Sequence, residues 1–162
     1  YLALNNNQLH RNFQGYCTTR TTGQVYGFGA SSISQLFSAY SQNVKNAAQY
    51  IKMINEKNTA VLRGYNLERN EKIIRDVINS VMCNYYVDFS EIAKKYESDS
   101  DEIKEIVGFD NEKFKDFVDL NFMKIENDKI IIYDSARLYI RNIAMEFDPL
   151  LNKKIGTYSK TI

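Results

Sequence analysis

Between residues 70 and 82, apolar side chains recur at every third or fourth position, which is the spacing of one buried face of a helix. This apolar stripe consists of Ile73, Ile74, Val77, Ile78, Val81 and Met82. A weaker pattern of the same period predicts another helix over residues 43–57. The chain is therefore predicted to be mainly helical from Ser38 onward.

Two short helices are predicted after residue 88. Ser90 can cap the first of them, which carries Ile92 and Tyr96 on its apolar side. The second carries the apolar residues Phe114, Phe117, Val118 and Leu120.

A hairpin and a final helix complete this region. Residues 123–126 and 129–133 read as short strands, and Asn127-Asp128 can form the turn between them. Ser135 can then cap a helix with the apolar residues Leu138, Ile140, Ile143, Ala144 and Phe147. Helices followed by a two-stranded wing resemble a winged-helix arrangement.

Residues 11–34 have a different composition, rich in Gly, Thr, Ser and aromatic residues. Aromatic and β-branched residues favour strands, and glycines permit the positive φ of tight turns. We therefore predict a strand-rich segment over residues 1–38 and a helical domain over residues 39–162. The predicted fold class is α+β, mainly α.

Composition and charge point to a globular protein with one core, or a small domain with an appendage. The chain has 162 residues, 44% of them hydrophobic and 25% charged, and a net charge of +1. That charge is too small to attract nucleic acid or anionic lipid, and no apolar run approaches the roughly 18 residues of a membrane span. We therefore expect a soluble, cytoplasmic protein without a signal peptide.

Only two cysteines occur, Cys17 and Cys83, and they form no CxxC or CxxxCxC pattern. Neither a zinc site nor an iron–sulfur site can be built from this pair alone. Buried thiols with no redox role are the simplest interpretation.

Several short strings occur in one order along the chain. They are His10–Tyr16, Gly27–Ser34, Tyr40–Asn43, Arg63-Gly64, Arg75–Ile78 with Met82–Asn84, Arg141–Ile143 with Phe147-Asp148, and Tyr158–Ile162. Each string alone is weak, but together they resemble the C-terminal third of oxygen-independent coproporphyrinogen III oxidase, a radical S-adenosylmethionine enzyme of haem synthesis. One departure is Ile74-Arg75, where the family usually has an arginine pair.

The resemblance implies a partial TIM-like barrel with a CxxxCxC-bound 4Fe–4S cluster and S-adenosylmethionine, followed by a mostly helical C-terminal domain. Residues 1–38 would then be a remnant of the barrel, and residues 39–162 the helical domain with its winged-helix-like hairpin. The implied reaction is the oxidative decarboxylation of coproporphyrinogen III to protoporphyrinogen IX. Because the cluster motif is absent, the chain alone is expected to be inactive and to need the missing N-terminal barrel as its partner.

The same resemblance places Phe13, Gln14 and Ile33 beside a second S-adenosylmethionine and the substrate cavity. A glutamine offers an acceptor and two donors, and Phe13 and Ile33 can form an apolar wall. From residue chemistry alone, a core phenylalanine, a solvated glutamine and a core isoleucine are the preferred interpretations, and only the resemblance favours ligand contacts. No catalytic residue and no metal ligand is assigned.

The remaining candidates have structural interpretations. His10 is the only histidine and has no evident partner in the sequence to orient it, so a structural role is preferred. Arg75, Arg137 and Arg141 lie beside apolar stripes, where ion pairs with the many acidic residues are expected rather than a phosphate or carboxylate site.

Two other functions compete with this interpretation. The first is a winged-helix module that binds nucleic acid or protein, but residues 88–134 contain fourteen Asp or Glu, seven Lys and no Arg, which opposes phosphate binding. The second is a lid or brace without ligand contacts. Because strands cut from a barrel have open edges, residues 12–34 are also expected to form a local hairpin or to pair with a second copy of the chain.

Overall fold

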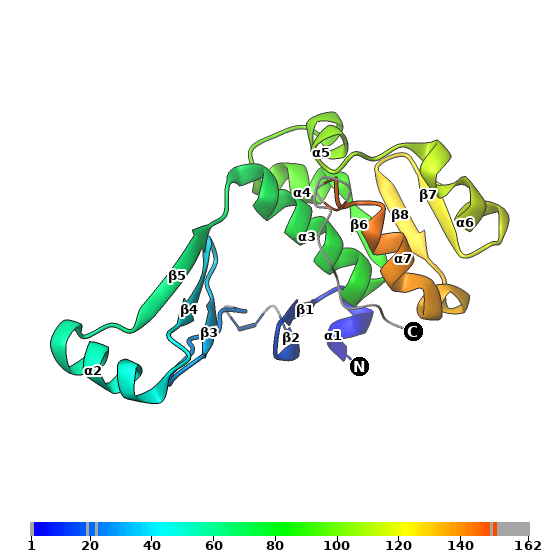
Figure 1. Cartoon of the computed structure of the whole chain (residues 1–162). Coiled ribbons are helices and arrows are strands. Elements are labelled where there is room, and N and C mark those ends of the chain that lie inside the picture. The colour runs from blue at the N-terminus through cyan, green and yellow to red at the C-terminus, as the bar shows by residue number, and fades with distance from the viewer. Residues whose placement is uncertain (1, 19, 22, 150, 152–162) are drawn as a thin grey trace. The chain divides into compact units, whose positions relative to one another are not determined.

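The computed structural model describes residues 2–18, 20–21, 23–149 and 151. The predicted string Tyr158–Ile162 lies outside the described residues. The chain divides into two compact units, Tyr1–Lys72 and Ile73–Ile162, which are described here one at a time (Figure 1).

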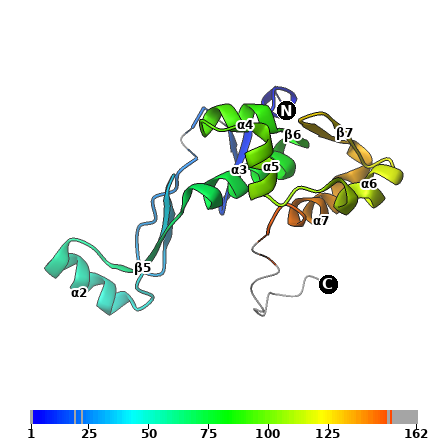
Figure 2. The ribbon, with the colours of Figure 1, turned by 90° about the horizontal axis from the view of Figure 1, so that it is seen from above.

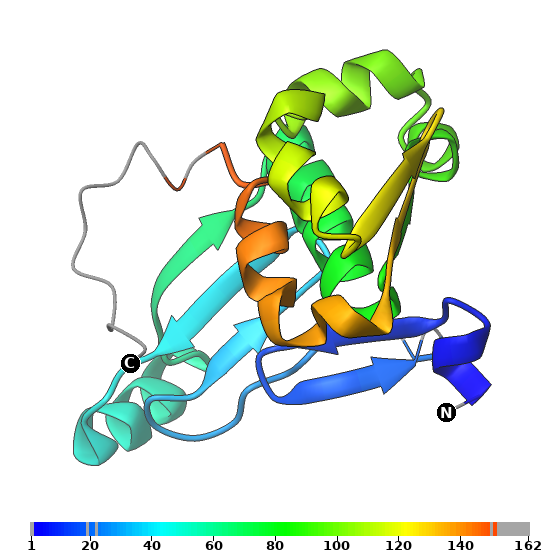
Figure 3. The ribbon, with the colours of Figure 1, turned by 90° about the vertical axis from the view of Figure 1, so that its right-hand side faces the viewer.

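The first unit contains a hairpin, a three-stranded sheet and one longer helix. Its elements are α1 (Leu2–Asn5), β1 (Leu9–Asn12), β2 (Gly15–Thr18), β3 (Ile33–Gln35), β4 (Ala39–Asn43), α2 (Ala47–Lys57) and β5 (Val61–Asn66). The strands β1 and β2 pair with each other, and β3, β4 and β5 lie side by side in that order (Figure 3). All these pairs are antiparallel, whereas the strands of a TIM-type barrel are parallel.

The sheet corrects the prediction of a mainly helical chain from Ser38 onward, because β4 and β5 were both missed. Strand β4 reads Ala-Tyr-Ser-Gln-Asn and β5 reads Val-Leu-Arg-Gly-Tyr-Asn, so neither has the regular alternation of apolar and polar residues that marks a half-buried strand. The sheet also crosses the predicted boundary between residues 38 and 39, since β4 pairs with β3. The assignment of residues 1–38 to the end of a barrel stays a prediction.

The helix predicted over residues 43–57 begins later, at Ala47, because Asn43 belongs to β4. Asn46 caps α2 by accepting a hydrogen bond from the backbone N–H of Gln49 at 2.9 Å. The helix ends at Asn58, which adopts the left-handed conformation with φ 54°. Figures 1 and 2 show α2 beyond one end of the sheet, in the connection that leads from β4 to β5.

The second unit combines helices with a three-stranded antiparallel sheet. Its elements are most of α3 (Arg69–Asn84), β6 (Tyr86–Asp88), α4 (Phe89–Lys95), α5 (Ser100–Ile106), η1 (Asn111–Phe114), α6 (Lys115–Asp119), β7 (Met123–Glu126), β8 (Lys129–Ile132), η2 (Asp134–Tyr139) and α7 (Ile140–Met145). The mixture of helix and strand agrees with the predicted class. The predicted hairpin is confirmed as β7 and β8, but β6 adds a third strand beside β8 that was missed.

The core of this unit is built on the predicted stripe of α3 and on a cluster of aromatic rings. Ile73, Val77 and Val81 are fully buried. The ring of Phe114 lies 4.8 Å from that of Phe147 and 5.5 Å from that of Phe109, the distances of stacked or tilted aromatic pairs. The buried members of the core are Ile73, Ile74, Val77, Val81, Val87, Phe89, Ile92, Ala93, Ile103, Val107, Phe114, Met123, Ile130, Ile132, Ala136, Ile140, Ile143, Ala144 and Phe147.

The final helix differs from its prediction in two ways. Ser135 does not cap it: the segment begins as the 3₁₀ turn η2 after Tyr133, and the Ser135 hydroxyl donates to the carbonyl oxygen of Asn121 at 3.4 Å. Leu138, assigned to the apolar face, is 91% exposed. A 3₁₀ turn advances three residues per turn rather than 3.6, so the helical period misplaces Leu138.

Asp88, rather than Ser90, caps α4. The Asp88 carboxylate accepts from the backbone N–H groups of Ser90 at 3.0 Å and Glu91 at 3.3 Å, and from the Ser90 hydroxyl at 2.6 Å. The hydroxyl of Tyr86 donates to the same carboxylate at 3.1 Å, and the Lys129 ammonium lies 3.2 Å away. A buried charge of this kind is tolerated because it is fully hydrogen-bonded.

These contacts predict acid sensitivity. Burial by itself raises the pKa of Asp88, but hydrogen bonds from Ser90, Lys129 and Tyr86 outweigh it and lower the pKa to about 2. The ordinary pKa of an unfolded aspartate is about 3.9, so the stabilisation is complete above about pH 5 and is lost as the pH falls through the folded pKa. We expect the free energy of unfolding to fall by about 2 kcal/mol on this account between pH 5 and pH 2.

Urea unfolding at several pH values measures this loss. Asp88→Asn keeps a capping side chain but does not titrate, so the loss between pH 5 and pH 2 should be smaller in this variant by about 2 kcal/mol. Parallel pH profiles of the wild-type chain and the variant would contradict the assignment.

Candidate functional site

One face of the β3-β4-β5 sheet gathers side chains from three of the strings found in the sequence. Ile33 pairs with Gln42, which pairs with Arg63; Gln35 pairs with Tyr40, which pairs with Tyr65. Directly opposed residues of antiparallel strands project to the same face, and so do residues two positions apart along one strand. Two rows of side chains therefore share this face: Ile33, Gln42 and Arg63 in one, and Gln35, Tyr40 and Tyr65 in the other.

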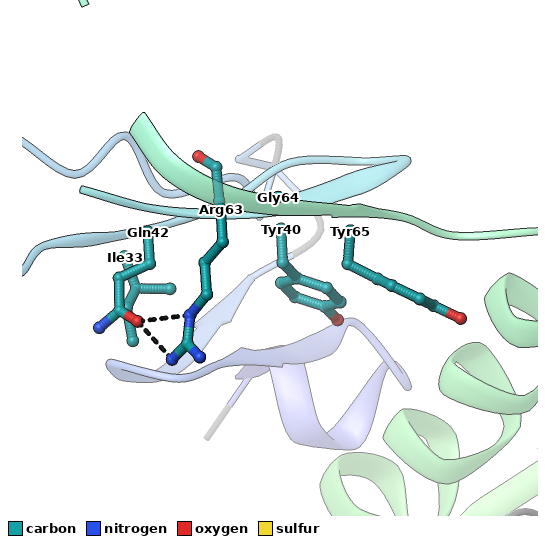
Figure 4. Close-up of a pocket in the computed structure, with 7 residues that line it drawn as sticks. Ile33, Tyr40, Gln42, Arg63, Gly64 and Tyr65 are labelled. Atoms are coloured by element: carbon teal, nitrogen blue, oxygen red, sulfur yellow. Dashed lines mark hydrogen bonds between the residues drawn. The ribbon is translucent and has the colours of Figure 1, made fainter. Parts of the chain in front are cut away.

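A hollow of about 230 Å³ opens on this face. It is lined by Ile33, Tyr40, Ser41, Gln42, Arg63, Gly64 and Tyr65. Figure 4 shows the side chains of Ile33, Tyr40, Gln42, Arg63 and Tyr65 projecting from the same side of the sheet. The lining is an isoleucine and two phenol rings around a single charged group, Arg63. This combination is typical of a site for an apolar molecule that carries an anionic group.

The guanidinium of Arg63 is held in place by Gln42. The Gln42 side-chain oxygen accepts from Nε of Arg63 at 3.0 Å and from Nη2 at 2.6 Å, as the dashed lines in Figure 4 mark. The Gln42 amide nitrogen donates to the carbonyl oxygen of Ser31 at 3.3 Å, which fixes the orientation of the amide. The strings that contain Ser31, Gln42 and Arg63 thus meet in one chain of hydrogen bonds.

Tyr65 closes one end of the hollow. Its hydroxyl donates to the carboxylate of Glu71, and this hydrogen bond is the main reason why the pKa of Tyr65 is raised. The other oxygen of Glu71 accepts from the backbone N–H of Glu68 at 3.0 Å, as in a capping box at the start of α3. Glu71 thereby fixes the position of the phenol.

Phe13 and Gln14 form the turn between β1 and β2, where Asn12 pairs with Gly15. The Phe13 backbone N–H donates to the buried side chain of Gln35 at 3.2 Å, which ties the turn to the face that carries Ile33. The side chains of Phe13 and Gln14 are exposed and do not line the hollow. Of the three predicted ligand residues, only Ile33 lies in the hollow; it is 40% exposed and not the core residue that its chemistry alone suggests.

The glycine-rich string before β3 has a packing role. A Cβ atom on Gly27 would lie 2.7 Å from the carbonyl oxygen of Ile33, so a larger residue cannot fit without displacing the backbone. The Asn43 amide nitrogen donates to the carbonyl of Gly29 at 3.1 Å and to the Ser32 hydroxyl at 3.0 Å. Asn43 therefore fastens the loop that leads into Ile33.

The other candidates take structural positions. The His10 ring lies where a side chain on Gly23 would otherwise be, 2.7 Å from the ideal Cβ position. Cys17 is half-buried, Cys83 is buried, and neither of them forms a disulfide. Arg137 pairs with Asp134 at 3.1 Å, as the ion-pair interpretation predicts.

Arg75 and Arg141 occupy different environments. The Nε atom of Arg75 lies 3.9 Å from the Asp76 carboxylate, an ion pair of the kind predicted. The Arg141 side chain is exposed on α7.

Two negative findings concern only the part of the chain that the structure describes. It contains no group of three or more His, Cys, Asp or Glu side chains placed to hold a metal ion. None of its helices is both long and apolar enough to cross a lipid bilayer.

Sequence reasoning did not select Tyr40, Gln42, Arg63 or Tyr65 as site residues. The strings Tyr40–Asn43 and Arg63-Gly64 contain three of these residues, but nothing in the local sequence indicates that the two strings pair in adjacent strands. The signal that could have found them is a spacing of two residues. Tyr40 and Gln42 are two positions apart, as are Arg63 and Tyr65, so each pair lies on one face if its segment is an extended strand.

No protein-family model matches the chain. The chain is 36% identical over 146 residues to the oxygen-independent coproporphyrinogen III oxidase of Escherichia coli, a match that covers 90% of this chain and 31% of that protein. It is 32% identical over its whole length to the protein of the same name from Helicobacter pylori, and covers 35% of it. The protein of that name from Thermostichus vulcanus is 33% identical, with 99% of this chain and 49% of that protein covered.

A solved structure agrees with these relatives. Coproporphyrinogen III oxidase from Escherichia coli, described as a radical SAM enzyme, superimposes with a TM-score of 0.78 and 34% identity. The match covers 91% of this chain and 33% of the solved chain. Both in sequence and in fold, the chain therefore belongs to the oxygen-independent coproporphyrinogen III oxidase family, and it spans about a third to a half of the length of these relatives.

Proposed function

We propose that the chain works as the C-terminal part of an oxygen-independent coproporphyrinogen III oxidase, in the conversion of coproporphyrinogen III to protoporphyrinogen IX. The observation that carries this proposal is the likeness in both sequence and fold to the Escherichia coli enzyme over 91% of the chain. Radical chemistry would come from S-adenosylmethionine and a 4Fe–4S cluster. The contribution of this chain is to bind, orient and shield the ligands.

The first unit would form part of the wall around a second S-adenosylmethionine and the substrate. The features that support this role are the hollow beside Ile33 and the exposed Phe13-Gln14 turn, which Gln35 ties to the same face of the sheet. The turn offers an aromatic ring and an amide with both donors and an acceptor. The antiparallel strands of the first unit would pair with the edge of the barrel sheet. This pairing would cover the open edges of the strands.

The second unit would cover the substrate or brace the barrel. Its order of elements supports the description of a winged-helix-like domain: a helix and β6 come first, then the helices α4, α5 and α6 with the 3₁₀ turn η1, and then the β7-β8 hairpin. The acidic excess over residues 88–134 disfavours nucleic acid as its ligand, so a protein surface is the better alternative partner. A cytoplasmic location is proposed because neither cysteine forms a disulfide, as is usual in a reducing compartment.

The 4Fe–4S cluster does not fit the residues of this chain. Three cysteine thiolates are needed in the radical SAM family, and the two that are present lie on β2 and α3, in different units. We therefore assign the cluster to the N-terminal barrel. After anaerobic reconstitution with iron and sulfide, the chain alone should show no stoichiometric cluster absorbance and should not cleave S-adenosylmethionine. A stoichiometric cluster would overturn this assignment.

A chimera tests the proposed function. The homologous third of the Escherichia coli enzyme is replaced by this chain, and protoporphyrinogen IX is quantified under anaerobic conditions. We expect coproporphyrinogen III to be decarboxylated, because the chain supplies the same fold at the same place. A chimera that folds, holds its cluster and cleaves S-adenosylmethionine but forms no protoporphyrinogen IX would contradict the proposal.

A further inference from the structure

The Arg63 guanidinium is held in position by hydrogen bonds, but some of its N–H donors have no acceptor among the described residues. Gln42 accepts from Nε and Nη2, and the Nη1 group, which carries two further donors, has no acceptor among the residues that the structure describes. Arg63 also makes no ion pair with any carboxylate in that part of the chain. A neutral amide thus orients the cation without neutralising it.

The surroundings of Arg63 favour an anion that is attached to an apolar body. Ile33, Tyr40 and Tyr65 line the hollow with it, and no acidic residue does. A hydrogen bond between a guanidinium and a carboxylate is charged on both sides and can be bidentate, so it is stronger than a hydrogen bond between neutral groups. The side chain is also preorganised, because the carbonyl of Ser31 orients Gln42 and Gln42 orients Arg63. Part of the conformational entropy of the Arg63 side chain is therefore already lost before a ligand binds.

We propose that Arg63 and Gln42 form a carboxylate-binding subsite, which receives a carboxylate through the guanidinium while the ligand's apolar part packs on Ile33, Tyr40 and Tyr65. The identity of the ligand rests on the proposed function: the carboxylate belongs either to a propionate of the porphyrinogen or to the methionine part of S-adenosylmethionine. Both present the same chemistry to Arg63.

Equilibrium binding to the chain itself tests the subsite without requiring turnover. Coproporphyrin III, the stable aromatic form with the same four propionates, is titrated by its fluorescence, and S-adenosylmethionine is titrated by calorimetry. Arg63→Gln should weaken binding of the ligand that uses the subsite on the order of tenfold to a hundredfold. Arg63→Lys keeps the positive charge but loses the planar guanidinium, so its affinity for that ligand should lie between those of the wild-type chain and Arg63→Gln. In NMR spectra, the Nε–Hε resonance of Arg63 should shift when the ligand that uses the subsite is added.

Arg141→Gln is the matched control, because it removes an exposed positive charge from the second unit. It should bind both ligands as the wild-type chain does, and circular dichroism should show that all variants are folded. An effect on one ligand only identifies the source of the carboxylate. Binding that does not depend on Arg63, or no binding of either ligand, would overturn the subsite. An inactive chimera with Arg63-dependent binding would instead refute the proposed function and leave the subsite standing.

Discussion

Phe114→Ala is expected to lower the free energy of unfolding of the second unit by about 3–5 kcal/mol, the usual loss for a fully buried phenylalanine. Phe114 is 0% exposed and its ring packs on those of Phe109 and Phe147. Truncation removes these contacts and leaves a cavity that neighbouring rings can fill only in part. Urea unfolding followed by circular dichroism measures the loss.

Phe28→Ala is the matched control for this substitution. Phe28 is 89% exposed, so its truncation should change the free energy of unfolding by no more than about 0.5 kcal/mol. A loss below about 1 kcal/mol for Phe114→Ala would mean that the aromatic cluster does not form the core of the unit.

Gln14→Ala and Ile33→Ala should each reduce decarboxylation by the chimera on the order of a hundredfold, because displacement of a bound reactant by about 1 Å can cost that much. Ile33 lines the hollow, and Gln14 belongs to the turn that Gln35 ties to the same face. The cluster should remain intact in both variants. Initial rates of protoporphyrinogen IX formation, with iron content measured in parallel, test the expectation.

Helix α2 offers a control of the same residue types. Gln49 and Ile51 lie there, outside the hollow, and both are exposed. Gln49→Ala and Ile51→Ala should therefore keep near-normal rates. If Gln14→Ala and Ile33→Ala also turn over normally, these residues are not part of the ligand wall.

Elements with strong local signals could be predicted from the sequence. The stripe of α3 and the β7-β8 hairpin were found because their apolar periods and turn residues lie within a few positions of each other. Strands β4 and β5 were missed because long-range pairing stabilises them: Tyr40 meets Tyr65 across an insertion that contains α2. The predicted caps at Ser90 and Ser135 were wrong for a local reason: α4 begins directly after Asp88, and the last helical segment begins as a 3₁₀ turn directly after Tyr133, so neither serine stands at the capping position.

The candidate site was only partly visible in the sequence. Ile33, Phe13 and Gln14 came from resemblance to a family, and their ligand roles stay proposals. The Arg63–Gln42 pair could not be predicted, because its two members are far apart in the chain and meet only once the register of β4 and β5 is fixed. A glutamine opposite an arginine has no distinctive signal in a single sequence.

We propose that the face of the sheet carrying Ile33 and Arg63, together with the turn tied to it, forms a wall against the ligands. Hydrogen exchange of the chimera, with and without S-adenosylmethionine and coproporphyrin III, tests this most directly. We expect slower exchange on ligand addition over residues 12–14, 33–42 and 61–66, and unchanged exchange in α4 and α5. Unchanged exchange in those three segments, while the ligands demonstrably bind elsewhere on the chimera, would contradict it.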